Sequence, residues 1–229
     1  MKKAKYVIVD YRIDNELKNK LLEYAEKVVF TCQMSTYDSI CGHADIQIFK
    51  LSSNKIICAP ECYEYYKLHL KDINVICGNN NPGNKYPEDV LYNACFNNNI
   101  LIHNLKYTDK RILSEIESKD INLINVKQGY TKCSICELNN NSFITDDDSI
   151  FKVLKSKKIN VLKVPYGIVK LENFDYGFIG GASGKFNSKI FFTGKINDEI
   201  RTFCEINETA PVELSEKPLI DIGTIIFLN

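Results

Sequence analysis

The sequence predicts a single α/β domain over residues 1–229, built from five ββαβ units that close into a five-bladed propeller. Two observations carry this prediction: a repeat of nearly constant length, and two terminal segments that are each incomplete but complement one another. The repeats begin at Ile46, Val90, Cys133 and Gly177, so successive starts lie 44, 43 and 44 residues apart. Independent elements would rarely keep so steady a spacing.

Each repeat reads as a strand, a short polar turn, a second strand, an amphipathic helix and a third strand. The first repeat, "IQIFKLSSNKIICAPECYEYYKLHLKDINVIC", has its turn at 52–54, and the next two have "NNN" turns at 97–99 and 139–141. Asn and Ser are typical of hairpin loops. Thr108 and the acidic run 146–148 then stand where helix N-caps are expected.

The fifth unit is divided between the two ends of the chain. The tail "GTIIFLN" predicts a strand that no helix follows, and the head "KYVIVDYRIDNELKNKLLEYAEKVVF" predicts strand, helix and strand with no hairpin partner before it. Pairing tail with head completes the unit and removes the exposed sheet edges. A doubly wound α/β sheet also alternates strands and helices, but it accounts for neither the paired strands nor the split unit.

The composition is that of an ordinary soluble protein, with 45% hydrophobic and 25% charged residues. Twenty-nine basic residues balance 29 acidic ones, so bulk charge indicates no nucleic-acid or anionic-membrane partner. The apolar run near the N-terminus, Tyr6–Val9, is too short for a signal peptide, and we expect a cytoplasmic protein. The nine cysteines are odd in number and often lie in apolar runs, which favours buried thiols over disulfides. Composition does not predict the oligomeric state.

The segment "SICGHADIQIF" gathers reactive side chains. Interpreted as a strand, it places Cys41, His43, Asp45 and Gln47 on one face, because successive side chains of a strand alternate. The chain has three histidines, and His43 is the one that shares a predicted strand face with a carboxylate. We therefore expect His43 to belong to a site.

Five ββαβ units closed by the termini resemble the pentein, or guanidine-modifying-enzyme, superfamily. Its members include arginine deiminase, agmatine deiminase, dimethylarginine dimethylaminohydrolase and a non-catalytic ribosome anti-association factor. The strings "QGYTKCSI", "ITDDDSI", "GFIGGASGK" and "DIGTIIFL" resemble an uncharacterised bacterial branch of this fold. The resemblance covers essentially the whole chain and implies a central channel with the active site at one end.

Three motifs carry the resemblance to individual roles. "GHAD" resembles the Gly-His-x-Asp motif of agmatine deiminases, which implies His43 as general acid/base and Asp45 as the anchor of the guanidinium group. "LYNACFNNNILI" resembles the following unit and implies Asn93 as a substrate-binding residue. "GYTKC" resembles the approach to the nucleophilic cysteine and implies Cys133 in that role. The resemblance thus implies a hydrolase of a small guanidino or amidino compound.

The order of the units departs from the family pattern. The familiar enzymes carry the nucleophile near the C-terminus, whereas Cys133 lies in the third unit, so the assignment requires a shifted starting point. An unshifted comparison places Gln128 near the position of the family's histidine and finds no cysteine in "DIGTIIFLN". This alternative predicts a non-catalytic pentein that binds a small ligand or a protein at the channel mouth.

Two further motifs have simpler interpretations. Cys133 and Cys136 have the spacing of a zinc or redox pair, but no second pair occurs, and we expect neither metal nor cofactor. "IGGASGK" lacks the phosphate-loop spacing, and a strand follows it. Its glycines allow a ligand or a neighbouring backbone to approach closely, so Gly180, Gly181 and Ser183 are predicted to bind substrate.

Overall fold

Hairpin, helix and returning strand recur in the computed structural model, which describes residues 2–97, 99–117, 119–139 and 141–229. Within those residues the mixed α/β fold contains five three-stranded sheets, each an antiparallel pair extended by a parallel strand. Their elements are β3 (Ile48–Ser52), β4 (Lys55–Cys58), α3 (Tyr63–His69), β5 (Asn74–Cys77); β6 (Cys95–Phe96), β7 (Ile100–His103), α4 (Lys110–Ile116), β8 (Asn122–Asn125); β9 (Ile135–Glu137), β10 (Ser142–Thr145), α6 (Asp148–Ser156), β11 (Asn160–Lys163); β13 (Ser183–Phe186), β14 (Lys189–Phe192), α7 (Asp198–Ile206), β15 (Ala210–Glu213); and β17 (Ile226–Leu228), β1 (Ala4–Val9), α1 (Asn15–Leu21), β2 (Ala25–Phe30).

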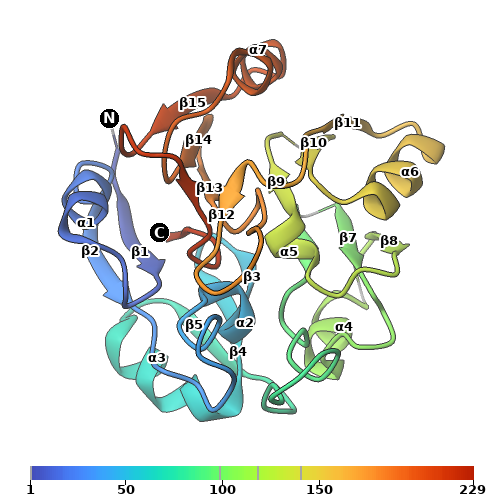
Figure 1. Ribbon diagram of the computed structural model, residues 1–229. Coiled ribbons are helices and arrows are strands. Elements are labelled where there is room, and N and C mark those ends of the chain that lie inside the picture. Colours follow the sequence, from blue (N-terminus) through green and yellow to red (C-terminus); the bar gives the residue numbers. More distant parts are fainter. Residues whose placement is uncertain (1, 98, 118, 140) are drawn as a thin grey trace.

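The fifth sheet joins the two ends of the chain, as predicted. Strand β1 pairs antiparallel with β17, with Tyr6 opposite Leu228 and Ile8 opposite Ile226, and it pairs parallel with β2. Figure 1 shows β1 and the C-terminus side by side. Every strand residue of β17 is buried, so the pairing adds apolar contacts to backbone hydrogen bonds.

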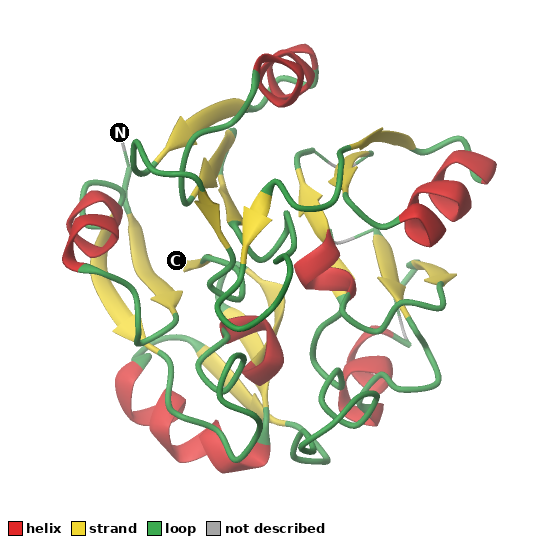
Figure 2. Cartoon of the chain, in the orientation of Figure 1, coloured by secondary structure: helices red, strands yellow, loops and turns green. Residues whose placement is uncertain are grey.

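The helices of the five units lie on the outside of the molecule, with the strands nearer its middle (Figures 1 and 2). Helix α6 illustrates why: Ile150 and Leu154 lie on one face and are buried, while its other face is polar. Asp147 caps this helix by accepting the Ile150 N–H. The cap of α4 is Asp109 and not Thr108, whose hydroxyl bonds the His103 ring instead.

Five further short elements lie between the repeated ones: α2 (Ala44–Gln47), η1 (Pro60–Cys62), α5 (Thr131–Ser134), β12 (Val169–Lys170) and β16 (Leu219–Ile220). Both predicted "NNN" turns join strands as expected, although their middle residues, Asn98 and Asn140, lie outside the described residues. No helix in the described ranges has both the length and the apolar character that crossing a bilayer requires.

The predicted strand over 39–49 is wrong for most of its length. The chain turns, forms the single helical turn α2, and enters β3 at Ile48, where the register with Cys58 begins. The Asp45 N–H bonds Gly223 O instead of a sheet partner. The alternating polar side chains are therefore not a solvated strand face, and His43, Asp45 and Gln47 are all buried. Cys133, predicted on a strand, lies likewise on the short helix α5.

Candidate functional site

The side chain of Asn93 joins the segments that carry the predicted nucleophile and the predicted anchor. Its Oδ1 accepts the N–H groups of Lys132 (2.8 Å) and Cys133 (3.1 Å). Its Nδ2 donates to Cys133 Sγ at 3.0 Å and to the Asp45 carbonyl oxygen at 3.4 Å. Asn93 is fully buried, so these bonds fix α5 against α2 without competition from water.

Cys133 and Asp45 are in direct contact although 88 residues separate them in sequence. The thiol donates to Asp45 Oδ2 at 3.1 Å, and the same oxygen accepts the hydroxyl of Thr224 at 2.7 Å. The other carboxylate oxygen, Oδ1, is buried and has no hydrogen-bond partner among the described residues. Burial raises the pKa of Asp45 above its ordinary value, because a charged carboxylate is poorly solvated there.

His43 faces a second buried carboxylate, that of Asp221. The distance from His43 Nδ1 to Asp221 Oδ1 is 3.9 Å, and Nδ1 has no hydrogen-bond partner among the described residues. Gly223 allows this approach: its φ is +66°, and a β-carbon there would lie 2.2 Å from His43 Cβ. Burial lowers the pKa of His43, so its ring is neutral near pH 7 and able to accept a proton.

His43 and Cys133 line the same cavity, which has a volume of about 310 Å³ and is called here the thiol cavity. Asp221 lies in its wall as well, held by the backbone N–H groups of Phe178 and Gly223. The remaining lining residues are mostly aromatic: Tyr37, Ile40, Tyr130, Leu171, Phe174, Asp175, Tyr176 and Phe178. The cavity therefore combines a thiol, an imidazole and a carboxylate with aromatic walls.

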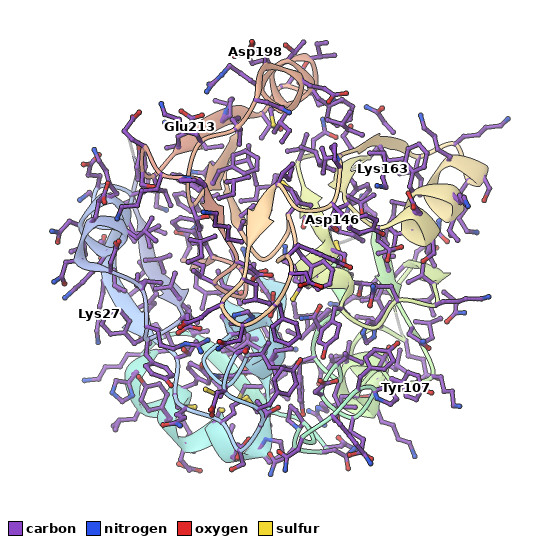
Figure 3. All side chains as sticks on the ribbon, in the orientation of Figure 1. Lys27, Tyr107, Asp146, Lys163, Asp198 and Glu213 are labelled. Atoms are coloured by element: carbon purple, nitrogen blue, oxygen red, sulfur yellow. The ribbon has the colours of Figure 1, made fainter. Side chains whose placement is uncertain are left out.

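Two more buried carboxylates stand close to this cavity. Asp146 accepts the Ile179 N–H with one oxygen, while its other oxygen has no described partner, and burial raises its pKa to about 8. Figure 3 shows Asp146 nearer the middle of the molecule than Asp198, which lies at the rim. Asp89 accepts the hydroxyl of Tyr130 with one oxygen and leaves the other unpartnered in the described structure. Neither Asp89 nor Asp146 forms an ion pair with a described residue, whereas Asp221 has His43 beside it.

These carboxylates also act on the thiol. The pKa of Cys133 is raised well above its ordinary value, first by burial and then by the negative charges of Asp45 and Asp221. In the absence of a ligand the sulfur is therefore a protonated thiol. A cation placed beside it would favour the thiolate, because an opposite charge stabilises the ionised form.

The glycines predicted to bind substrate lie behind the thiol cavity, against the backbone that carries Cys133. A β-carbon on Gly180 would lie 2.2 Å from the carbonyl oxygen of Lys132, and the Gly181 N–H donates to Cys133 O at 2.8 Å. Ser183 donates its hydroxyl to Gly180 O. None of the three is among the described residues that line the cavity. The close approach of Gly180 is to a neighbouring backbone, and that of Gly181 is to the carboxylate of Asp221.

Sequence reasoning missed the second half of the site. The sequence pattern places Asp221 only in a strand-like tail and Asp146 at a helix cap, a task that Asp147 performs alone. One signal was available: a run of three acidic residues offers more carboxylates than one cap requires. Gln128, the unshifted counterpart of the family's histidine, donates to Asp147 and is not among the residues lining the cavity.

Comparison with known proteins finds a matching family and several structures with a similar architecture. The model of a family of unknown function (DUF6873) matches residues 8–226, and no curated protein matches the sequence. DDAH from Pseudomonas aeruginosa, a cysteine-to-serine mutant complexed with citrulline, gives a TM-score of 0.58 at 9% identity over 93% of both chains.

Two further solved structures are similar. An amidinotransferase of saxitoxin biosynthesis from Microseira wollei has a TM-score of 0.54 and 12% identity over 93% of this chain and 89% of its own. Agmatine deiminase from C. jejuni with substrate bound has a TM-score of 0.53 and 9% identity over 93% and 88%. At such identities the likeness shows the fold alone, and that fold is the one that the sequence resemblance to the penteins indicated.

Proposed function

Because this chain belongs to the family of unknown function DUF6873 and has the pentein fold, we propose that it is a cysteine-dependent hydrolase of a small guanidino or amidino cation. The proposal includes closure of the five units into a five-bladed propeller, with the thiol cavity at one end of its channel. The pairing of β17 with β1 supports closure, as do the contacts of β13 with both β9 and β17.

One observation carries the proposal: buried polar atoms without partners among the described residues lie in and beside the thiol cavity. They include His43 Nδ1 in the cavity wall, Asp45 Oδ1 on the carboxylate that accepts the thiol, and Asp146 Oδ1 on a carboxyl whose pKa is raised by burial and by the charge of Asp221. Each such atom costs about 1–3 kcal/mol when left unpaired, so a ligand that pairs them gains free energy. A planar guanidinium or amidinium group offers several N–H donors and a positive charge, and the aromatic walls add cation–π attraction.

The proposed reaction divides the work among four side chains. Asp221 and Asp45 hold the cation, whose charge lowers the pKa of the Cys133 thiol, and neutral His43 accepts the thiol proton. The sulfur then bonds to the central carbon, and His43 returns the proton to the departing amine. Water, deprotonated by His43, attacks the resulting thiouronium (from a guanidine) or thioimidate (from an amidine). The C–S bond breaks to give a urea or an amide, respectively, and His43 returns its proton to the departing thiolate.

Asn93 and the glycine segment act on the position of the nucleophile in this scheme. Asn93 holds the Cys133 sulfur through its Nδ2 group, and it binds the backbone N–H of the same residue through Oδ1. Gly180, Gly181 and Ser183, proposed above as substrate-binding residues, then contribute indirectly, by letting that backbone lie close to β13. A displacement of about 1 Å at the sulfur would be costly for the attack.

A second candidate is a non-catalytic pentein that binds the same class of cation. The raised pKa of Cys133 favours it, because a thiol that stays protonated is a poor nucleophile. The two candidates share the ligand and differ in whether the C–N bond breaks.

The test measures ammonia or amine release and ligand-induced thermal stabilisation over arginine, agmatine, methylated arginines, simple guanidines and amidines. We expect the wild type to release amine from at least one compound and Cys133→Ser to lose more than about 10³-fold of that rate while still binding. The exposed Cys77 supplies the control, and Cys77→Ser should retain full activity.

Each outcome decides between the candidates. Stabilisation without amine release establishes the binder, whereas activity that survives Cys133→Ser refutes the nucleophile assignment. If no compound in the panel stabilises the protein or releases amine, the proposal as a whole is overturned. Asp221→Asn should abolish both signals if the cation binds in the thiol cavity.

A further inference from the structure

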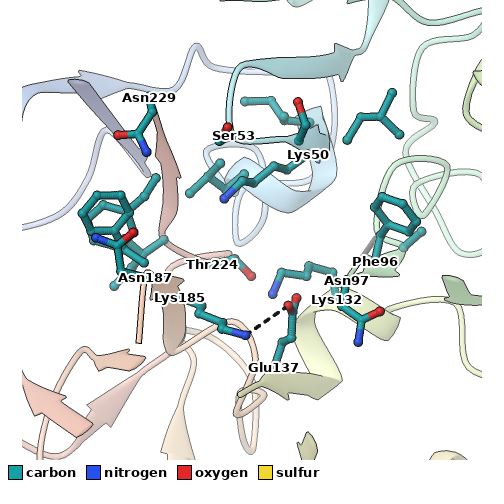
Figure 4. Close-up of a pocket in the computed structure, with 18 residues that line it drawn as sticks. Lys50, Ser53, Phe96, Asn97, Lys132, Glu137, Lys185, Asn187, Thr224 and Asn229 are labelled. Carbon is teal, nitrogen blue, oxygen red and sulfur yellow. Dashed lines mark ion pairs between the residues drawn. The ribbon is translucent and has the colours of Figure 1, made fainter. Parts of the chain in front are cut away.

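A second cavity, with a volume of about 270 Å³, shares no described lining residue with the thiol cavity. Three lysines from three different sheet units reach it: Lys50 of β3, Lys132 of α5 beside β9, and Lys185 of β13. Figure 4 shows their amino groups directed toward a common space. We call it the lysine cavity.

Positive charge exceeds negative charge among the side chains of this cavity. Glu137 is the one acidic side chain among the described residues that line it, and it pairs with Lys185 at 3.7 Å. No described carboxylate forms an ion pair with Lys50 or Lys132, and both residues are partly buried. Burial lowers the pKa of Lys50 to about 8; the charge of Glu137 opposes this shift, and the charges of Lys132 and Lys185 add to it. Holding like charges together in a partly buried cavity is unfavourable unless an anion neutralises them.

The other walls indicate what kind of anion fits. Phe96, Phe186 and Phe227 line the cavity, together with the hydroxyl-bearing Ser53 and Thr224. The volume exceeds what a bare inorganic ion requires and approaches the lower end of the range for small-molecule sites. A ligand with a doubly charged group and a small apolar part would match both the lysines and the aromatic surface.

We propose that the lysine cavity binds a small organic dianion, either a phosphate monoester or a dicarboxylate, through Lys50, Lys132 and Lys185. This site is separate from the thiol cavity but adjoins it through two residues. Thr224 lines the lysine cavity and donates its hydroxyl to Asp45, and Lys132 directly precedes Cys133. A bound dianion is therefore placed to influence the thiol cavity through these two residues.

The test is isothermal titration calorimetry at low ionic strength with sulfate, phenyl phosphate and succinate. We expect at least one of the two organic dianions to bind more tightly than sulfate, and the better of them identifies the anionic group. Lys50→Met and Lys185→Met should each weaken binding about 10-fold or more, because each removes a charge-assisted contact. Lys152→Met, at an exposed position on α6, is the matched control and should bind like the wild type.

Glu137→Gln keeps the test decisive if a lysine variant fails to fold. Removing the one negative side chain from the described lining should tighten dianion binding by several-fold. The proposal is overturned if none of the three anions binds the wild type, or if Lys50→Met and Glu137→Gln both leave the affinity unchanged. Because none of the substituted residues lines the thiol cavity, failure here leaves the hydrolase proposal standing.

Discussion

Substitution of Asp146 by Asn should stabilise the protein at high pH while weakening the proposed cation site. Burial raises the pKa of Asp146 from 3.8 to about 8, so the folded carboxyl keeps a proton that the unfolded chain releases. Stability is therefore lost as the pH rises from about 4 to about 8 and is constant above that range. At about 1.4 kcal/mol for each pKa unit, full ionisation costs folding about 6 kcal/mol.

The amide removes this cost but adds a smaller one. Its oxygen can still accept the Ile179 N–H, whereas its Nδ2 group replaces the unpartnered Oδ1 and costs about 1–3 kcal/mol. We expect Asp146→Asn to be more stable than the wild type by about 3 kcal/mol near pH 9, a rise in Tm of about 6–12 °C. Near pH 5, where little of the ionisation cost is present, the two proteins should be nearly equal.

Urea unfolding of both proteins between about pH 5 and about pH 9 measures the difference directly. Asp198→Asn, in the exposed first turn of α7, is the matched control and should change stability by about 1 kcal/mol or less at every pH. If the wild type and Asp146→Asn show the same pH dependence, the carboxyl is not held protonated in the fold. The proposal that these carboxylates bind a cation would then be refuted.

Two further predictions concern the geometry and charge of the thiol cavity. Gly180→Ala should destabilise the protein by about 1–3 kcal/mol in urea unfolding, because the new methyl group would lie 2.2 Å from Lys132 O and 2.5 Å from Cys133 O; unchanged stability would show that α5 can move away freely. The affinity for a guanidino ligand found in the panel should increase as the pH rises through about 8, because Asp146 then ionises and attracts the cation. Calorimetry that shows equal affinity at about pH 6.5 and about pH 9 would contradict this role.

The repeat period was sufficient to predict the sheet units because hydrophobic alternation and hairpin turns are local properties. Each predicted hairpin and helix appears in its unit, and β17 pairs with β1 as the incomplete ends indicated. The structure of the site segments depends instead on contacts between units. In α2 and α5 the polar residues bond partners from other units, so the local pattern imitated a strand where the backbone forms a helical turn.

Contacts among side chains distant in sequence were predictable only in part. The family motifs assigned Cys133 and Asp45 to the same site, and their side chains are in contact in the structure. The sequence does not indicate a site role for Asp221, because its segment has the pattern of residues that precede a strand. Its function as a neighbour of His43 arises from the left-handed turn at Gly223, which sequence alone does not locate.

The pairing of β1 with β17 also affects when the protein can fold. A ribosome makes β1 first and β17 after all the other elements described here, so this sheet cannot form until the whole chain between them has been translated. Asp221 and Thr224 emerge in the same late stretch, beside residues of the thiol cavity that were made long before. Four sheet units can collapse during synthesis, but the proposed cation site acquires the carboxylate of Asp221 only after they have been made. A nascent chain therefore carries an unfinished pocket for most of its translation.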